Sequence, residues 1–529
     1  MRSGTGSTAP ESPERVRLDH DQRMLVLGVC VAVGATCVIP ATYNYVVGPM
    51  MATFDSEEGT SSLLRQVPNI ASLLVLFVAG VLGAWLGERR TMVIGGVVMA
   101  VGNLVVMVAP TYPVVIVGLA LEAAGTTVLA VVALSVIGAR IHDEGARASA
   151  FATFTMVSPA VYLVLPVLAG VLLEMVTWRA VAGIWALAAV AAVVASLRLI
   201  PAGDGGPRRE LLTPLLAGVV CLAVVQAISN MHVDGSVSVA TVVRLGVAAV
   251  GIALLVWAFR RLPSPSLSLA ALRRGGVVLL LVVVALWCFT QLWYYMTLAF
   301  EYVFGLNVFW TAMAMVPAQL CAVVGARAAG RMVQRRGITF SGAALLCGTG
   351  VSLALAVAVN VDSPLWWAIV VTCLYSMFTV AAGVPLTNAI MDSAPPGEEG
   401  SAAAFRSAAI NIGLVIGIAI VSSFVYTAFT TSLAGQFDAA GLEPGQAADI
   451  AEDLRDGAAS EEEAAIYAVP VGRVEEIGRM QQVAMMDGLD AQSWSGAVVS
   501  FLSAGAFVWA RRRQQRAPKP LQPGSGGGP

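Results

Sequence analysis

The chain is divided into fourteen apolar runs that alternate with short polar breaks. A membrane-spanning helix needs about 20 mostly apolar residues, so the runs are long enough to cross a bilayer. Only 12% of the 529 residues are charged and 57% are hydrophobic, whereas about a quarter of an ordinary soluble domain is charged. We therefore exclude a soluble globular protein and expect an all-α integral membrane protein. The predicted spans are 24–48, 65–83, 91–110, 112–138, 150–173, 179–199, 212–230, 239–259, 276–299, 307–329, 338–359, 364–390, 402–428 and 492–510.

The positions of the basic residues predict the orientation of these spans. An even number of spans places both ends of the chain on one side, and 25 of the 31 basic residues lie in the tails, loops and helix ends of that side. The positive-inside rule then makes both termini cytoplasmic. Segment 430–490 is expected outside, with 13 acidic and 3 basic residues. Ser460 and Glu463 have the spacing of a helix-capping box, which favours a small extracellular helical cap, with a solvated loop as the alternative.

Several function classes lack the residues that they need. A net charge of −2 provides no overall field for binding nucleic acid. The seven cysteines form no CxxC pair and the three histidines are scattered, so we expect no metal site and no cofactor. Neither a nucleophile–base pair nor a nucleotide-binding loop is recognisable, so we expect no enzyme activity. A membrane-embedded sensor or enzyme that uses segment 430–490 is the less favoured alternative.

Two short motifs occur twice and indicate an internal duplication. The first is a pair of glycines seven residues apart at a helix end with arginines beside them: Gly80, Gly87, Arg89 and Arg90 in one copy, and Gly330, Arg335 and Gly337 in the other. The second is a Glu-Gly pair that begins a helix, at 144–145 and 399–400. These repeats predict two parallel six-helix halves with two inserted helices, an architecture that transporters use. The predicted parts are a disordered cytoplasmic tail 1–23, an N-terminal half 24–200, inserted helices 201–275, a C-terminal half 276–510 and a cytoplasmic tail 511–529.

These motifs resemble those of the major facilitator superfamily, and in particular its fourteen-helix drug:proton antiporter branch. The stretch from Gly80 to Arg90 is similar to the family's signature in the loop between helices 2 and 3. Further matches to the branch are Trp178–Arg179, Gly305–Leu306, Pro317, Gly400, Gly413 and Gly417. The resemblance covers nearly the whole chain and implies a secondary transporter whose partners are a small-molecule substrate, protons and the lipid bilayer.

The chain departs from the family pattern at positions that carry charge. The acid of the loop 2–3 signature falls on Ala84, and its counterpart in the second half falls on Gln334, which implies a weakened cytoplasmic latch. The acid of helix 1 falls on Ile39, although Asn44 is kept. These departures imply a divergent or differently coupled antiporter.

Two other signatures are partly kept. In the antiporter signature of helix 5, Pro166 and Gly170 are present while two glycines are replaced, so we expect the bend in this helix to persist. In helix 4 the family's buried arginine falls on Leu119, and its glutamine falls on Glu122.

Glu122 is the candidate proton-coupling residue. It lies about ten residues into its span, and a rise of 1.5 Å per residue places it roughly 15 Å deep, near the membrane midplane. An ionised carboxylate there costs about 2.5–3.5 kcal/mol, so the group carries a proton or faces a wet cavity. Loading and releasing a proton at this depth is what coupling requires. The alternative is a neutral glutamic acid that forms a hydrogen bond between helices.

Aromatic and amide side chains provide the candidate substrate pocket. Trp287, Gln291, Tyr294 and Tyr295 have the spacing of one helical face, and aromatic rings with polar tips suit amphipathic ligands. The alternative for the two tyrosines is the interfacial aromatic belt. Tyr43 and Asn44 are further substrate-binding candidates, because an unpaired amide facing lipid is costly.

Asp392 and Arg406 are a possible gate. Both are expected near the cytoplasmic ends of their helices, where an ion pair could close the path. The alternative for Arg406 is snorkelling to the interface.

Together these features favour proton-coupled efflux of small amphipathic drugs or metabolites by alternating access. The alternative is an uncoupled or differently coupled metabolite exporter. We expect a monomer that does not bind nucleic acid. The single lysine, Lys519, against thirty arginines suggests a GC-rich bacterial genome, and hence a bacterial inner-membrane protein.

Overall fold

The computed structural model of the chain describes residues 19–54, 58–203, 205–207, 209–234, 239–262, 265–269, 272, 275–395, 397–440, 450, 466 and 470–516. Among these residues helix is the only regular secondary structure. The helices are α1 (His20–Thr53), α2 (Glu58–Leu86), α3 (Glu88–Val108), α4 (Tyr112–Arg140), α5 (Glu144–Met175), α6 (Trp178–Leu199), α7 (Leu212–Asp234), α8 (Val239–Arg261), α9 (Gly276–Phe289), α10 (Leu292–Tyr302), α11 (Val308–Ala356), α12 (Leu365–Ser393), α13 (Glu399–Ala439) and α16 (Val471–Arg516).

Polar side chains at the helix starts explain where several helices begin. The first backbone N–H groups of a helix have no partner within it, and a preceding Asp, Asn or Thr can accept their hydrogen bonds. Asp143 accepts from the Ala146 N–H of α5 at 2.7 Å. Asn307 accepts from the Trp310 N–H of α11 at 2.9 Å. The polar breaks between the apolar spans therefore contain the capping residues at which these helices begin.

The helices account for fourteen membrane crossings. Thirteen described stretches are long and apolar enough to cross a membrane, and α9 with α10 counts as one of them. Helix α11 is a single stretch of 49 residues, but its backbone is non-helical at Gly337 (φ 76°, ψ 167°), so it holds two crossings. The all-α architecture with fourteen spans is therefore confirmed.

The glycine repeat predicted from the sequence has the same backbone conformation in both copies. Gly87, between α2 and α3, has φ 86° and ψ 148°, close to the values of Gly337. A positive φ is readily adopted only by glycine. The same turn therefore joins the second and third helices of each repeat.

One predicted span is broken in the structure. The helix expected over 276–299 is divided into α9 and α10 at Thr290 and Gln291. The carbonyl groups released by the break have side-chain partners, because the Gln492 amide donates to Phe289 O at 3.0 Å and the Tyr375 hydroxyl donates to Thr290 O. Such partners are what allow irregular backbone at membrane depth.

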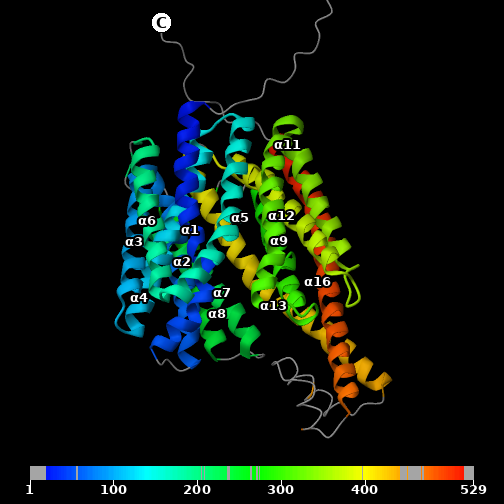
Figure 1. Cartoon of the computed structure of the whole chain (residues 1–529). Coiled ribbons are helices and arrows are strands. Elements are labelled where there is room, and N and C mark those ends of the chain that lie inside the picture. Colours follow the sequence, from blue (N-terminus) through cyan, green and yellow to red (C-terminus); the bar gives the residue numbers. More distant parts are fainter. Residues whose placement is uncertain are drawn as a thin grey trace, which may run out of the picture.

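The helices form two groups with a pair beside them (Figure 1). Helices α1 to α6 pack against one another, and so do α9, α11, α12, α13 and α16. Helices α7 and α8 pair together, and α7 also packs against α2 and α13. The described chain begins at Asp19 and ends at Arg516 at the same end of the bundle, which we name the terminal end (Figure 1).

Segment 430–490 differs from the expected loop with a cap. Helix α13 continues to Ala439 and α16 already begins at Val471, so both extend beyond the other helices at the end opposite the terminal end (Figure 1). The two extensions are joined where Gln436 donates to Met480 O at 3.2 Å. Hydropathy ended the predicted spans at 428 and 492 because the flanking residues are polar, yet those residues still form helix. The predicted cap start at Ser460 and Glu463 lies outside the described residues.

Candidate functional site

A cavity of about 540 Å³ lies between the two groups of helices. This volume is in the range of pockets that hold drug-sized ligands. Its walls come from α1 and α5 on one side and from α9 to α13 on the other. The lining residues are Val33, Phe154, Thr155, Ser158, Pro159, Tyr162, Val283, Leu286, Trp287, Thr290, Gln291, Trp293, Tyr294, Gln319, Tyr375, Thr379, Val380, Gly383, Leu386 and Arg406.

The structure separates the predicted pocket residues into two groups. Trp287, Gln291 and Tyr294 line the cavity. Tyr295 does not line it and is 9% exposed, with its ring 5.2 Å from that of Tyr294 in an edge contact. Tyr43 is also away from the cavity wall, because its hydroxyl donates to Leu64 O at 2.7 Å within the first group of helices. The Asn44 side chain is outside the described part of the structure.

The break between α9 and α10 places Gln291 and Trp293 in the cavity wall. Gln291 donates to Trp287 O at 2.8 Å, and the Trp293 indole donates to Ser376 Oγ at 2.8 Å. Behind them α13 approaches closely, since a Cβ on Gly413 would lie 2.7 Å from Val284 O. Residues at the break therefore have positions that an unbroken helix would not give them.

Helix α5 supplies cavity residues that were not predicted. Thr155, Ser158 and Tyr162 lie on one helical face and line the cavity opposite α9 and α10. Their spacing of three and four residues in an otherwise apolar span was a usable signal. This polar face of α5 belongs to the first group of helices. In that group the sequence predicted only Tyr43 and Asn44 as pocket residues.

Arg406 lines the cavity, and the expected pair with Asp392 is not formed. Asp392 instead accepts hydrogen bonds from Arg147 of α5 and from Arg511 of α16, the latter at 3.0 Å. The reason is their position. Asp392 is at the last turn of α12, whereas Arg406 is seven residues inside α13, roughly 10 Å deeper at 1.5 Å per residue.

Polar contacts join the two groups of helices at the terminal end. Besides the Arg147–Asp392 ion pair, the Arg147 Nε–H donates to Asn388 Oδ1 at 2.7 Å. Gln334 donates to Gly145 O at 3.0 Å. Gln334 stands where the family has an acid, so an uncharged side chain makes a contact between the halves there.

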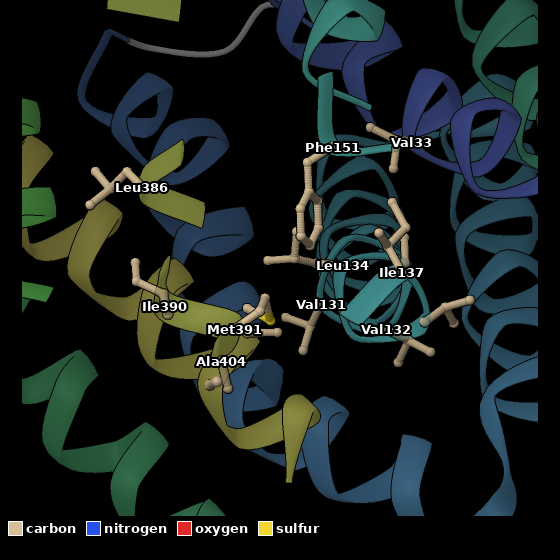
Figure 2. Close-up of a cluster of buried hydrophobic side chains, with 14 of the residues drawn as sticks. Val33, Val131, Val132, Leu134, Ile137, Phe151, Leu386, Ile390, Met391 and Ala404 are labelled. Carbon is tan, nitrogen blue, oxygen red and sulfur yellow. The ribbon is translucent and has the colours of Figure 1, made fainter. Parts of the chain in front are cut away.

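An apolar layer closes the same end beneath the cavity. In Figure 2, Val131, Leu134 and Phe151 of one group face Met391 and Ala404 of the other. Gly80 and Gly400 permit this closure, because a Cβ on Gly80 would lie 2.5 Å from Gly400 O. The rings of Phe77 and Phe405 are 5.5 Å apart beside it. Gly330 has the corresponding role at α5, where its Cβ would lie 2.6 Å from Ala152 Cβ.

The linker to the inserted helices covers the first loop signature. Gly206 N–H donates to Ala84 O at 3.0 Å, and a Cβ on Gly205 would lie 2.1 Å from Trp85 O. Beside them Arg140 and Glu88 form an ion pair of 2.8 Å. The linker backbone thus contacts the position at which the family's acid is replaced by Ala84.

Glu122 is buried away from the cavity. It is 5% exposed and accepts a hydrogen bond of 2.6 Å from Thr126 of its own helix. It does not line the cavity, and α3 packs tightly beside it, since a Cβ on Gly102 would lie 2.4 Å from Glu122 N. This hydrogen bond lies within α4, whereas the alternative that we considered was a hydrogen bond between helices.

The bend expected from the helix 5 signature stays a prediction, and the two residues that would carry it lie in α5. Pro166 lies inside the helix. A Cβ on Gly170 would meet no atom within 4 Å, so in this conformation the glycine makes no close packing contact.

Comparison with known proteins shows similarity to transporters. The sequence model described as Major Facilitator Superfamily matches residues 24–432. The multidrug resistance protein Stp of Mycobacterium tuberculosis (strain CDC 1551 / Oshkosh) is 24% identical over 402 residues, which are 74% of this chain and 73% of Stp. The multidrug efflux pump LfrA of Mycolicibacterium smegmatis is 26% identical over 432 residues, 78% of this chain and 82% of LfrA.

Two solved structures share the fold. The human organic anion transporter MFSD10 has a TM-score of 0.60 and 12% identity, with 92% of this chain and all of the other covered. The Escherichia coli fucose:proton symporter FucP has a TM-score of 0.55 and 11% identity, with 92% and 98% covered. At these identities the likeness concerns the fold alone.

Proposed function

Because the chain belongs to the Major Facilitator Superfamily, a family of membrane transporters and not of enzymes, we propose that it exports small amphipathic drugs or metabolites in exchange for protons. The observation that carries the proposal is the cavity between the two groups of helices, with closure at one end only a few turns away. A binding site with a gate beside it is the minimum that alternating access requires. The names of the relatives, a multidrug resistance protein and a multidrug efflux pump, support efflux.

The distribution of arginines supports a cytoplasmic terminal end. Of the 31 basic residues, 25 lie in the tails, loops and helix ends of that side, and basic residues are retained on the cytoplasmic side of membranes. In this orientation the closed gate faces the cytoplasm. Substrate would enter when the contacts of Arg147 and Gln334 open, and it would leave toward the outside after they have formed again.

Coupling to protons is proposed through Glu122. Burial of the Glu122 side chain favours a protonated carboxyl group, and the hydrogen bond that it accepts from Thr126 acts in the opposite sense. Access of water to Glu122 during the transport cycle would allow the proton to leave.

One observation favours an exporter coupled differently or not at all. Glu122 is absent from the cavity lining, which contains neither aspartate nor glutamate among the described residues. A substrate and a proton would then have no direct contact, and coupling would have to act through the packing of α4.

The experiment compares growth of a susceptible bacterial strain with and without the expressed protein against cationic, neutral and anionic toxic compounds. We expect resistance to a subset of amphipathic compounds, reduced cellular accumulation of that subset, and loss of the effect on dissipating the proton gradient. Equal accumulation of every compound in both strains, with the protein verified in the membrane, contradicts efflux. Export that persists without the gradient supports the uncoupled alternative.

A further inference from the structure

Arg406 gives the cavity a positive charge deep in the membrane. It lies on the same face of α13 as Gly413, seven residues further on, where α13 packs against Val284 and Trp287 of α9. Its side chain therefore points toward α9 and the cavity, which it lines. An arginine keeps its charge in proteins, so the cavity contains a permanent cation.

Two acids at the terminal ends of α12 and α13 have partners other than Arg406. Asp392 is bound by Arg147 and Arg511. Glu398, before the first turn of α13, accepts a hydrogen bond from Ser268. In the part of the chain that the structure describes, Arg406 forms no ion pair and no side-chain hydrogen bond, and the cavity wall contributes no carboxylate.

A charge without a partner in a largely apolar pocket is costly unless a ligand or water compensates it. The guanidinium group presents several N–H donors in one plane and binds a carboxylate or a similar anion through two parallel hydrogen bonds. The remaining wall is mainly aromatic and aliphatic, with Phe154, Tyr162, Trp287, Trp293 and Tyr294 at its sides. Such a wall suits the apolar body of a ligand whose single polar end is anionic.

We propose that the cavity binds amphipathic monoanions, whose carboxylate or sulfonate group contacts Arg406 while an aromatic or aliphatic body packs against α5, α9 and α10. The inference rests on the proposed export function only for the direction of movement, because binding is independent of transport. An anionic lipid headgroup has the same chemistry, and the test below separates it from a soluble anion.

The test uses three ligands that share one ring and differ in charge: 1-naphthylacetate, neutral 1-naphthylacetamide and (1-naphthylmethyl)trimethylammonium. Binding to the full-length protein in phosphatidylcholine nanodiscs is measured by titration calorimetry, with empty nanodiscs as the blank. We expect the anion to bind at least tenfold more tightly than the amide, a factor that corresponds to about 1.4 kcal/mol, and the cation to bind more weakly than either.

Three variants assign the preference to Arg406. Arg406→Gln should remove the preference for the anion and leave amide binding within about twofold, since the aromatic wall is unchanged. Arg406→Lys should keep part of the preference for the anion. Arg512→Gln, which removes an exposed arginine outside the cavity, should bind as the wild type does. Equal affinities for anion and amide in the wild type overturn the proposal, and so does an anion preference that survives Arg406→Gln. If Arg406→Gln fails to fold, the ligand series on the wild type and Arg406→Lys still decides.

Two further arms distinguish the source of the anion and the role of transport. If a lipid headgroup is the natural ligand, phosphatidylglycerol added to the nanodiscs should weaken naphthylacetate binding to the wild type and not to Arg406→Gln. If the natural ligand is a soluble anion, phosphatidylglycerol should have no effect. Either result is consistent with an anion site at Arg406. In proteoliposomes, an anion that binds but does not move contradicts the export function and leaves the site standing. Movement of amide and cation only, without an anion preference in binding, contradicts the site and leaves export standing.

Discussion

At the scale of single residues, the candidate proton-coupling residue and the candidate substrate-binding residues occupy different environments. Glu122 is enclosed between α3 and α4 with Thr126 as its partner, whereas Gln291 and Tyr294 are in the cavity wall. Depth in a helix could be predicted for Glu122 because it depends only on position along the chain. The direction in which it faces depends on how neighbouring helices pack, which a hydropathy pattern does not contain.

The coupling role of Glu122 leads to a prediction for the Glu122→Gln variant. Glutamine preserves the shape and one hydrogen bond to Thr126 but has no proton to exchange, so the variant should fold, bind substrate and lose transport driven by a pH gradient by roughly tenfold or more. The measurement is substrate-dependent proton movement in proteoliposomes. Thr126→Val is the matched control, because it removes the partner and keeps the carboxyl group. Unchanged pH-driven transport in Glu122→Gln would refute the assignment.

The cavity wall leads to a second prediction. Replacing Tyr294 or Gln291 by Ala should change resistance unevenly across compounds, because a contact in a pocket discriminates between ligands by about 1–3 kcal/mol. Tyr426 is 68% exposed and away from the cavity, so Tyr426→Ala serves as the control for loss of a tyrosine near the interface. A uniform loss of resistance that follows the amount of protein in the membrane would indicate packing and not substrate contact.

At the scale of elements, repeats were more predictable than breaks. Gly87 and Gly337 were found from their spacing because only glycine adopts their backbone conformation readily. The break at Thr290 and Gln291 was missed, since its stability depends on Tyr375 and Gln492 from distant helices. The pair of Asp392 was misassigned for the same reason, as Arg147 lies 245 residues away in sequence.

The linkers around the inserted helices lead to a prediction on pH. Glu210 precedes α7 and accepts hydrogen bonds of 2.9 Å from the backbone N–H groups of Thr213 and Ser266. Partial burial alone would raise the pKa of Glu210, but hydrogen bonds from the Thr213 hydroxyl and from backbone N–H groups outweigh it, so the pKa is lowered from its model-peptide value. A lowered folded-state pKa means that the ionised form stabilises the fold above the unfolded pKa, and that this stability is lost as the pH falls through the folded value.

We therefore expect Glu210→Gln to lower the melting temperature at pH 7, where wild-type Glu210 is ionised. The difference between the two proteins should shrink as the pH falls below about 4, the usual range for a glutamic acid. Melting of purified protein in detergent between pH 2.5 and 7.5 measures it. A difference that stays constant over this range would show that the charge of Glu210 has no part in holding Ser266.

At the scale of the whole molecule, a cavity lies beside contacts that join the two groups of helices at the terminal end. The fourteen-span architecture and the family were predictable from the sequence. Membrane thickness sets the length of each apolar run, and close helix contacts require small residues at fixed spacings. The closed state of the gate was not predictable, since it depends on contacts between halves such as Gln334 with Gly145. The boundaries of the two halves and the orientation of the termini stay predictions.

The most direct test of alternating access through this cavity is transport with the gate locked. In a version without the native cysteines, Gly145→Cys and Gln334→Cys place one thiol on each side of the gate, at residues now joined by a hydrogen bond of 3.0 Å. Transport of an exported compound in proteoliposomes is measured after the two thiols are bridged with a short bis-methanethiosulfonate reagent and again after reduction, with each single-cysteine variant as control. We expect the bridge to abolish transport in the double variant alone and reduction to restore it. Full transport by the cross-linked protein would contradict alternating access through this cavity, because substrate would then pass without opening the terminal end.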